Sequence, residues 1–394
     1  YYLHLGKDAT RFDVIKYLKD QNVEAAPYIP PSYFFNNYEP LISGETTQPL
    51  GGISNKRTIL CNEHGYFAEY QSDRYGLNNP DGVWDEKELD LIVIGDSFAQ
   101  GACVRNKDSF VGLIRAKYQK TANLGYSSAG TVSELAALRE FSKGKKAKAV
   151  ILFYFEGNDF EDVRNEAQNP TMSKYLTDNE FTQNLIFKQK EVDAFLSRVS
   201  DFQYSREMLR KMQGLDRYND KQRKFLEKTL VADIGMPIRI IRGILNRILL
   251  HDLTTVLRRA AEVKYPHLVG QKPVIITGLP LDYKQVLKVI QQAFNRIQDK
   301  ACDLDAKVFL FVIPHNGIEK TRHNLPETEM VLDLARKAGF SVVNPTKQLL
   351  SLHAPQPLYN GHFSEFGNKM MAEIVLEHIQ HETLSTAPGL CQKE

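Results

Sequence analysis

The sequence predicts an α/β fold built on a parallel sheet, and three observations lead to this prediction. Compact runs of apolar and β-branched residues alternate with helical patterns over residues 89–155. The same alternation returns from residue 271 onward, whereas residues 160–270 are charged and helical in period. Strands that alternate with helices form parallel sheets, because a parallel pair needs a long crossover connection.

The first half of the predicted core consists of three strands and two helices. Residues 89–94 are apolar and β-branched except for Asp90, and residues 148–155 are apolar after Lys148, which is the pattern of strands buried on both faces. Thr131 and Glu134 have the spacing of a capping box at the start of a helix. We therefore expect strands at 89–94, 121–125 and 148–155, and helices at 108–119 and 131–143.

The remaining chain divides into a second half of the core, an insertion and an N-terminal cap. In the second half we expect strands at 272–279, 307–313 and 340–344, and helices at 283–303, 325–338 and 364–382. Helical patterns at 181–212 and 238–264 characterise the insertion. Turn residues dominate the first 88 positions and predict an irregular or short-stranded cap. The predicted organisation is thus 1–88 extension, 89–159 first half of the core, 160–270 helical insertion and 271–394 second half.

Composition excludes several classes of function for the 394 residues. Lys and Arg number 50 and Asp and Glu number 48, so the net charge of +2 argues against nucleic-acid binding and polybasic membrane attachment. The longest apolar run, at 149–155, is far shorter than the ~20 residues that span a bilayer. The chain starts at Tyr1 without Met, and we expect that a signal sequence or anchor preceded it. No dinucleotide, P-loop or zinc motif is present, so no cofactor or metal is predicted.

Polar motifs follow the ends of the predicted core strands, where a parallel α/β sheet collects its functional groups. They are GDSF at 95–98, NLG at 123–125, EGND at 156–159 and NGHFS at 360–364. Each motif alone is ordinary turn or capping chemistry. Their order along the chain, at the ends of independently predicted elements, makes the set specific.

This set of motifs resembles the SGNH (GDSL-type) hydrolase superfamily, whose fold is a flavodoxin-like three-layer α/β/α sandwich. The resemblance covers residues 89–159 and 307–382. The longer phrases GDSFAQG at 95–101 and FEGND at 155–159 look like a bacterial branch associated with extracytoplasmic glycan modification. The fold class that the resemblance implies is a flavodoxin-like SGNH fold with an N-terminal extension and a helical insertion.

The resemblance also implies roles for individual residues. Ser97 would be the nucleophile and His362 its general base, because a serine hydroxyl needs a nearby base to attack an ester at neutral pH. The oxyanion formed by that attack needs fixed donors. The Ser97 N–H, the Gly125 N–H and the Asn158 side-chain amide would be those donors.

The acid of the catalytic triad is the point where this sequence departs from the family. Relatives carry an Asp two or three residues before the His, whereas this chain has Asn360 and Tyr359 there. Three interpretations follow: a Ser–His dyad in which Asn360 orients His362, a carboxylate from elsewhere such as Glu365, or an enzyme of low activity. We prefer the first, although an amide cannot stabilise an imidazolium by charge.

Other candidate residues have simpler interpretations. Asp96 and Asp159 order loops around the nucleophile in the family. Ser127 lies in a near miss to the Gly-x-Ser-x-Gly nucleophile elbow, whose final Gly is absent. His378 and His381 fit the solvated edge of an amphipathic helix better than a metal site.

The function that we expect is that of a serine esterase or O-acetyltransferase acting through an acyl-serine intermediate. Its expected substrate is an acylated carbohydrate of an extracytoplasmic, periplasmic polysaccharide, with a membrane acyl-donor protein as partner if it is a transferase. Membrane contact would come only through a preceding segment, and no nucleic acid is involved. The rival hypothesis is a glycan-binding or assembly protein that keeps the fold without turnover.

The four cysteines lack redox and zinc spacings. Cys61 lies in the extension and Cys103 six positions after the nucleophile, so a bond between them would hold the extension beside the active site. Two buried free thiols are the alternative. Cys302 and Cys391 are expected to be free.

Overall fold

The computed structural model describes residues 5, 9–30, 47–212, 281–351 and 356–383. The chain forms two compact units, one of residues 1–197 and 275–394 and the other of residues 198–274. The predicted strand at 272–279 and helix at 238–264 lie outside the described residues. All residues of the candidate site belong to the first unit.

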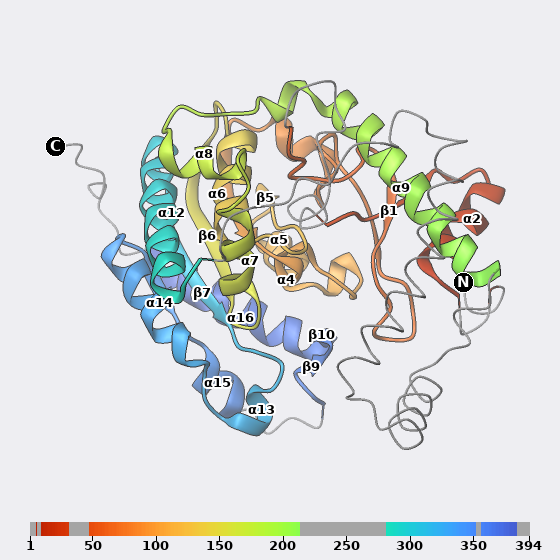
Figure 1. Ribbon diagram of the computed structural model, residues 1–394. Helices are drawn as coiled ribbons and strands as arrows, with labels where there is room; N and C mark the ends of the chain where they lie inside the picture. Colours follow the sequence, from red (N-terminus) through yellow and green to blue (C-terminus); the bar gives the residue numbers. More distant parts are fainter. Residues whose placement is uncertain (1–4, 6–8, 31–46, 213–280, 352–355, 384–394) are drawn as a thin grey trace, which may run out of the picture. The chain divides into compact units, whose positions relative to one another are not determined.

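The core of the first unit is a five-stranded sheet in which every neighbouring pair is parallel (Figure 1). Its strands in spatial order are β5 (Thr121–Asn123), β4 (Glu88–Gly95), β6 (Lys146–Phe155), β7 (Lys307–Ile313) and β8 (Ser341–Val343). Counted along the chain this order is 2-1-3-4-5, one of the common orders of doubly wound sheets. The predicted parallel α/β architecture is confirmed, and these five strands match the predicted ones.

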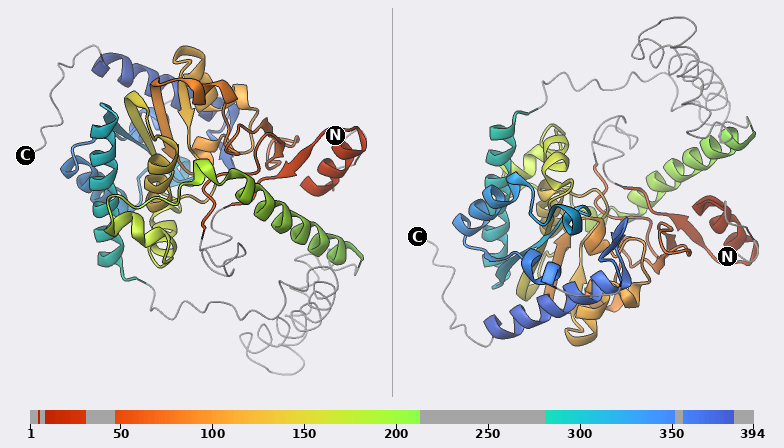
Figure 2. Two further views of the ribbon diagram at one scale, coloured as in Figure 1. Left: turned by 90° about the horizontal axis from the view of Figure 1, so that it is seen from above. Right: turned by 90° about the horizontal axis from the view of Figure 1, so that it is seen from below.

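Helices cover both faces of the sheet, which gives three layers (Figure 2). One face carries α6 (Thr131–Phe141), α7 (Asp159–Glu166), α12 (Tyr283–Asp303) and α14 (Pro326–Lys337). The other carries α5 (Phe110–Lys117) and α16 (Glu365–Thr383). On α12 the buried Val286, Ile290, Phe294 and Ile297 recur three or four positions apart, so one stripe of the helix faces the core.

The capping box predicted for α6 is wrong. The residue before the helix is Gly130, which has no side chain to cap it, and the Thr131 hydroxyl has no hydrogen-bond partner. Instead, Glu166 from α7 accepts the N–H groups of Gly130 and Val132 at 2.6 and 3.1 Å. A carboxylate from another helix therefore satisfies the free N–H groups at this end of α6.

The N-terminal extension contains more regular structure than its turn-rich composition predicts. It forms a helix and a small three-stranded sheet, namely α2 (Arg11–Asp20), β1 (Ala25–Pro27), β2 (Arg57–Ile59) and β3 (Glu69–Gln71). Strand β2 pairs in parallel with β1 and antiparallel with β3. The short strands agree with prediction, and α2, which has a capping box between Thr10 and Asp13, was not predicted.

The remaining elements are short helices and strands, together with the 24-residue helix α9. They are η1 (Asp81–Asp85), α4 (Ser97–Gln100), η2 (Asn106–Asp108), α8 (Met172–Thr177), η3 (Leu185–Phe187), α9 (Gln189–Met212), α13 (Ile318–Thr321), α15 (Thr346–Ser351), β9 (Tyr359–Asn360) and β10 (His362–Phe363). Residues 160–197, which the sequence assigns to the insertion, belong to the same compact unit as the sheet.

Among the described helices, none combines the length and the apolar character that crossing a bilayer requires.

The structure decides between the two alternatives for Cys61 and Cys103 and corrects the expectation for Cys302. Cys61 and Cys103 form a disulfide with a Cα–Cα distance of 4.9 Å. Cys302, expected to be free, is disulfide-bonded as well. It lies half-buried on the last turn of α12, and its pairing could not be predicted because the fold, not the spacing in sequence, decides which sulfurs meet. Cys391 lies outside the described residues.

Candidate active site

Ser97 stands at the turn between β4, which lies between β5 and β6 in the sheet, and the short helix α4. Asp96 precedes it as the N-cap and accepts the Phe98 N–H at 2.9 Å. This capping bond fixes the turn, so the Ser97 side chain projects from the carboxyl edge of the sheet. The sequence prediction that this loop presents a serine at the strand end is met.

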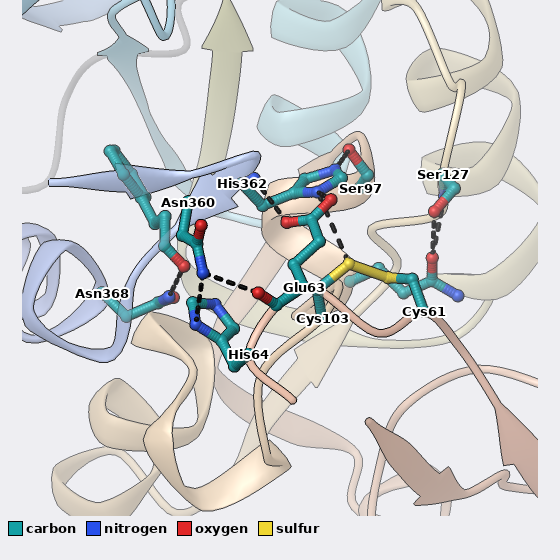
Figure 3. The surroundings of a disulfide bond; sticks show 11 residues. Cys61, Glu63, His64, Ser97, Cys103, Ser127, Asn360, His362 and Asn368 are labelled. Atoms are coloured by element: carbon teal, nitrogen blue, oxygen red, sulfur yellow. Dashed lines mark hydrogen bonds and ion pairs between the residues drawn. A yellow bond between two sulfur atoms is a disulfide. The ribbon is translucent and has the colours of Figure 1, made fainter. Parts of the chain in front are cut away.

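His362 lies on the β9–β10 hairpin, 265 positions along the chain from Ser97. Its Nε2 atom is 2.9 Å from Ser97 Oγ, within hydrogen-bonding distance (Figure 3). The ring also packs against Phe98, with the ring centroids 5.0 Å apart. The predicted proximity of Ser97 and His362 is confirmed.

The carboxylate beside His362 is Glu63, which comes from the N-terminal extension. Its Oε1 atom is 2.9 Å from His362 Nδ1, and its Oε2 atom accepts the His362 backbone N–H at 2.6 Å. Figure 3 shows the carboxylate of Glu63 on the side of the imidazole ring opposite Ser97. Ser97, His362 and Glu63 thus form a continuous Ser–His–carboxylate relay.

The contact with Glu63 decides which ring nitrogen of His362 carries the proton. A carboxylate can only accept hydrogen bonds, so the ring proton lies at Nδ1 and Nε2 is left as an acceptor. The Ser97 hydroxyl has two acceptors within reach, Nε2 at 2.9 Å and Asp96 Oδ2 at 3.2 Å. Burial raises the pKa of Glu63, but the hydrogen bonds from His362 outweigh burial and hold that pKa below its ordinary value. Glu63 is therefore ionised at neutral pH, as a group that stabilises an imidazolium must be.

Asn360 and Glu365 are the two residues that the sequence suggested in place of the acid of the triad, and neither has a hydrogen bond to the His362 ring. The side-chain amide of Asn360 donates to the Glu63 carbonyl oxygen at 2.6 Å and lies 3.3 Å from His64 Nδ1. Glu365 accepts a hydrogen bond from the Tyr66 hydroxyl at 3.1 Å. The expectation that Asn360 orients the ring is corrected, because its side-chain amide bonds to the loop that carries Glu63 and His64 and has no hydrogen bond to the His362 ring.

Sequence reasoning missed Glu63 because no local pattern marks it. It lies in an irregular loop between two three-residue strands, 299 positions from His362. One signal nearby could have drawn attention to the loop: Glu63 follows Cys61 by two positions, and the bond from Cys61 to Cys103 was considered from the sequence.

Gly361, between Asn360 and His362, is the residue that leaves room for Glu63. Its φ of +88° lies in the left-handed region, and a Cβ atom built there would overlap the Glu63 carboxylate. Replacing Gly361 with Ala is therefore expected to displace Glu63 and to lower kcat by about 10²-fold, the loss typical of a displacement of about 1 Å at a catalytic group.

Gly144 offers a matched control for this substitution. It also has a left-handed φ, +72°, but a Cβ atom built there meets no atom within 4 Å. Gly144→Ala should lower the melting temperature as Gly361→Ala does, since both place a side chain at positive φ, yet leave kcat unchanged. Equal kcat values for the two variants would show that Gly361 is needed only for its positive φ and not to leave room for Glu63.

The predicted oxyanion donors lie at the same edge of the sheet, but two of them have partners. The Gly125 N–H donates to Asn123 Oδ1 at 2.9 Å, so it is not the free donor expected from the sequence. The Asn158 amide donates to Asp162 Oδ2 at 2.6 Å. An amide nitrogen carries two hydrogens, which leaves a second N–H of Asn158 available. A Cβ atom on Gly125 would overlap Ala99 of α4, so this Gly permits the close approach of its loop to the nucleophile turn.

Five carboxyl groups lie close together at the nucleophile turn and beside it; Asp96, Glu134, Asp159 and Glu166 are buried, and Asp162 is half-buried. Burial raises the pKa of Asp96 to about 6, of Glu166 to about 7 and of Asp162 to about 8. The pKa values of Glu134 and Asp159 are also raised well above their ordinary values, by burial and by repulsion from the other carboxylates. Several of these groups therefore hold protons at neutral pH.

One group of described residues has the spacing of a metal site, namely Glu63, Cys103 and His362. The sulfur of Cys103 is bonded to Cys61 and cannot act as a thiolate ligand. The two remaining groups bond to each other. We therefore assign this cluster to the Ser–His–carboxylate relay and not to a metal.

Comparison with known proteins adds no assignment, since no protein-family model matches the chain and no curated protein is significantly similar to it in sequence.

Proposed function

We propose that this protein is a serine esterase or acyltransferase of SGNH type that works through an acyl-serine intermediate. The observation that carries the proposal is the relay from Ser97 through His362 to Glu63, with heavy-atom distances of 2.9 Å at both steps. The strand order 2-1-3-4-5, which is the flavodoxin-like order, supports the SGNH assignment. So does the placement of Ser97 directly after β4, the first strand of the sheet along the chain.

The chemistry follows from the geometry of the relay. Ser97 Oγ attacks the acyl carbonyl carbon while its proton moves to His362 Nε2, and Glu63 stabilises the resulting imidazolium. The bond to the leaving alcohol then breaks, and that alcohol takes the proton from His362. Water or the hydroxyl of a second sugar attacks the acyl-serine and gives its proton to His362. The bond between the acyl carbon and Ser97 Oγ then breaks, His362 returns the proton to Oγ, and a carboxylic acid or a new ester is released.

The proposed substrate is an O-acetylated carbohydrate of an extracytoplasmic polysaccharide, with a membrane acyl-donor protein as the partner of a transferase. This part rests on the resemblance of residues 95–101 and 155–159 to glycan-modifying enzymes. The disulfide between Cys61 and Cys103 supports an oxidising compartment, because stable disulfides are rare in the cytosol.

The rival hypothesis of a protein without turnover loses its motivation. It rested on the presence of Asn360 where the family has Asp. Glu63 makes the hydrogen bond with His362 Nδ1 that this Asp would make. The proposal therefore keeps a complete relay without a carboxylate at position 360.

A serine-directed fluorophosphonate probe tests the proposal without knowledge of the substrate. The probe should label Ser97 of the wild-type protein, and Ser97→Ala should lose labelling and about 10⁶-fold of the turnover of p-nitrophenyl acetate, with the melting temperature nearly unchanged. Ser127→Ala is the control, because Ser127 is buried with its hydroxyl bonded to Gln100 at 2.5 Å, and labelling of Ser97 should persist in it. Labelling at Ser127, or no labelling at all, would refute the proposal.

A further inference from the structure

The loop that carries Glu63 has little regular structure of its own. It is closed at its base by two backbone bonds, Leu60 N–H to the Ala68 carbonyl at 2.8 Å and Ala68 N–H to the Cys61 carbonyl at 2.9 Å. Residues 62–67 lie beyond these bonds, and each is half-buried or exposed. Such a loop is less stable locally than the sheet that carries Ser97.

Glu63 forms its hydrogen bonds with the β9–β10 hairpin and not with the nucleophile. Both of its side-chain oxygens accept from His362, and its carbonyl accepts from Asn360. These bonds orient Glu63 relative to the histidine. They do not by themselves hold the loop against the segment that carries Ser97.

The disulfide makes that connection. Cys61 lies two positions before Glu63, and Cys103 lies six positions after Ser97, just beyond α4. Cys103 is fully buried, and its sulfur lies 3.6 Å from His362 Nδ1. Figure 3 shows the disulfide beside the Glu63 carboxylate and the His362 ring. Arg105, stacked on the Tyr66 ring at 4.7 Å, is a second and non-covalent link between the same two segments.

We infer that the Cys61–Cys103 disulfide is a positioning element that holds Glu63 against His362, so that turnover depends on the oxidised state of this bond. The inference rests on the proposed function. Reduction by a dithiol transfers two electrons and two protons to the two sulfurs, which become thiols while the dithiol becomes a cyclic disulfide. The loop is then free to move, and the Glu63 carboxylate leaves His362 for part of the time.

The test compares the full chain with Cys61→Ser/Cys103→Ser at a temperature where circular dichroism shows both to be folded. We expect kcat for p-nitrophenyl acetate to fall by about 10–10²-fold in the double variant, since displacement of a catalytic group by about 1 Å costs that much. We expect KM to change by less than about twofold, because the substitutions act on the position of Glu63, whose contacts are with His362.

A thermodynamic cycle separates positioning from general destabilisation. If the disulfide acts through Glu63, adding Cys61→Ser/Cys103→Ser to Glu63→Gln should cause little further loss, so the effects are not additive. Additive losses would overturn the inference. Cys302→Ser is the matched control, since it removes the bond of a cysteine at the far end of α12, and its kcat should equal that of the wild type.

A readout independent of activity separates failure of this inference from failure of the proposed function. The His362 backbone N–H donates to Glu63 Oε2, so its hydrogen exchange should become about tenfold faster or more in Cys61→Ser/Cys103→Ser if Glu63 is released. Unchanged exchange and unchanged kcat would overturn the inference. Wild-type protein that neither hydrolyses esters nor labels at Ser97 would instead overturn the proposed function, and hydrogen exchange would still decide the role of the disulfide.

Discussion

Replacing Glu63 with Gln is expected to lower turnover of p-nitrophenyl acetate by about 10⁴-fold while the protein stays folded. A Gln side chain has the same shape, and its oxygen can still accept the His362 backbone N–H. Its amide group, however, can donate to Nδ1, which favours the tautomer with the proton on Nε2. That tautomer cannot accept the proton of Ser97, and the charge that stabilises the imidazolium is lost. Steady-state kinetics and a melting curve check this result.

Two substitutions control for this prediction. Glu365→Gln removes the other carboxylate considered from the sequence and should leave turnover near that of the wild type, because Glu365 bonds to Tyr66 and not to His362. Asn360→Asp should not raise turnover, since a carboxylate there would face the Glu63 carbonyl oxygen that now accepts from the amide. Loss of activity in Glu365→Gln with retention in Glu63→Gln would show that the relay is wrong.

Stability is expected to fall as pH rises from about 4 to about 8, and Asp162 should be one measurable source. Burial, then repulsion from Glu166, raises the pKa of Asp162 from 3.8 to about 8. Between these two values the folded state holds a proton that the unfolded state has released. The free energy of unfolding therefore falls with rising pH, by about 1.4 kcal/mol per pH unit for one such group. The loss is complete only above the pKa of the folded state.

Asp162→Asn isolates this contribution, because the amide oxygen can still accept from Asn158. Urea unfolding at several pH values from about 5 to about 8 measures the free energy of unfolding of both proteins. As pH rises, the value for the variant should increase relative to that of the wild type. Asp333→Asn, which removes an exposed carboxylate on α14, controls for the change in net charge. Parallel curves for Asp162→Asn and the wild type would mean that Asp162 is ionised across this range.

The fold was predictable where periodicity and burial act along consecutive residues. Strand β7, predicted at 307–313, has these bounds in the structure, because the six consecutive apolar residues after Lys307 are buried between two helical layers. The cap of α6 was not predictable, because its carboxylate comes from Glu166 of another helix. Helix α2 was missed for a different reason: the turn residues that surround it dominate the composition of the extension.

The candidate site divides in the same way. Ser97 directly follows a predicted strand, and His362 lies just before a predicted helix. In each case a sequence motif at the end of a predicted element indicated the residue. The role of Glu63 and its hydrogen bond with Asn360 both depend on contacts between segments almost 300 positions apart. No local sequence pattern indicates such contacts. The assignment of Cys302 as free failed because sulfur pairing is decided by tertiary proximity.

The spacing of the relay along the chain has a consequence for the order in which the protein is made and folds. Glu63 and His362 are 299 positions apart, so the site joins the two ends of the chain. Contacts of such high sequence separation form late, after the cost of closing the intervening loop has been met. A nascent chain or a partly folded intermediate that lacks the β9–β10 hairpin therefore has a serine but no base. Esterase activity would then report completed folding, and the chain would stay inert toward esters until its C-terminal segment has docked.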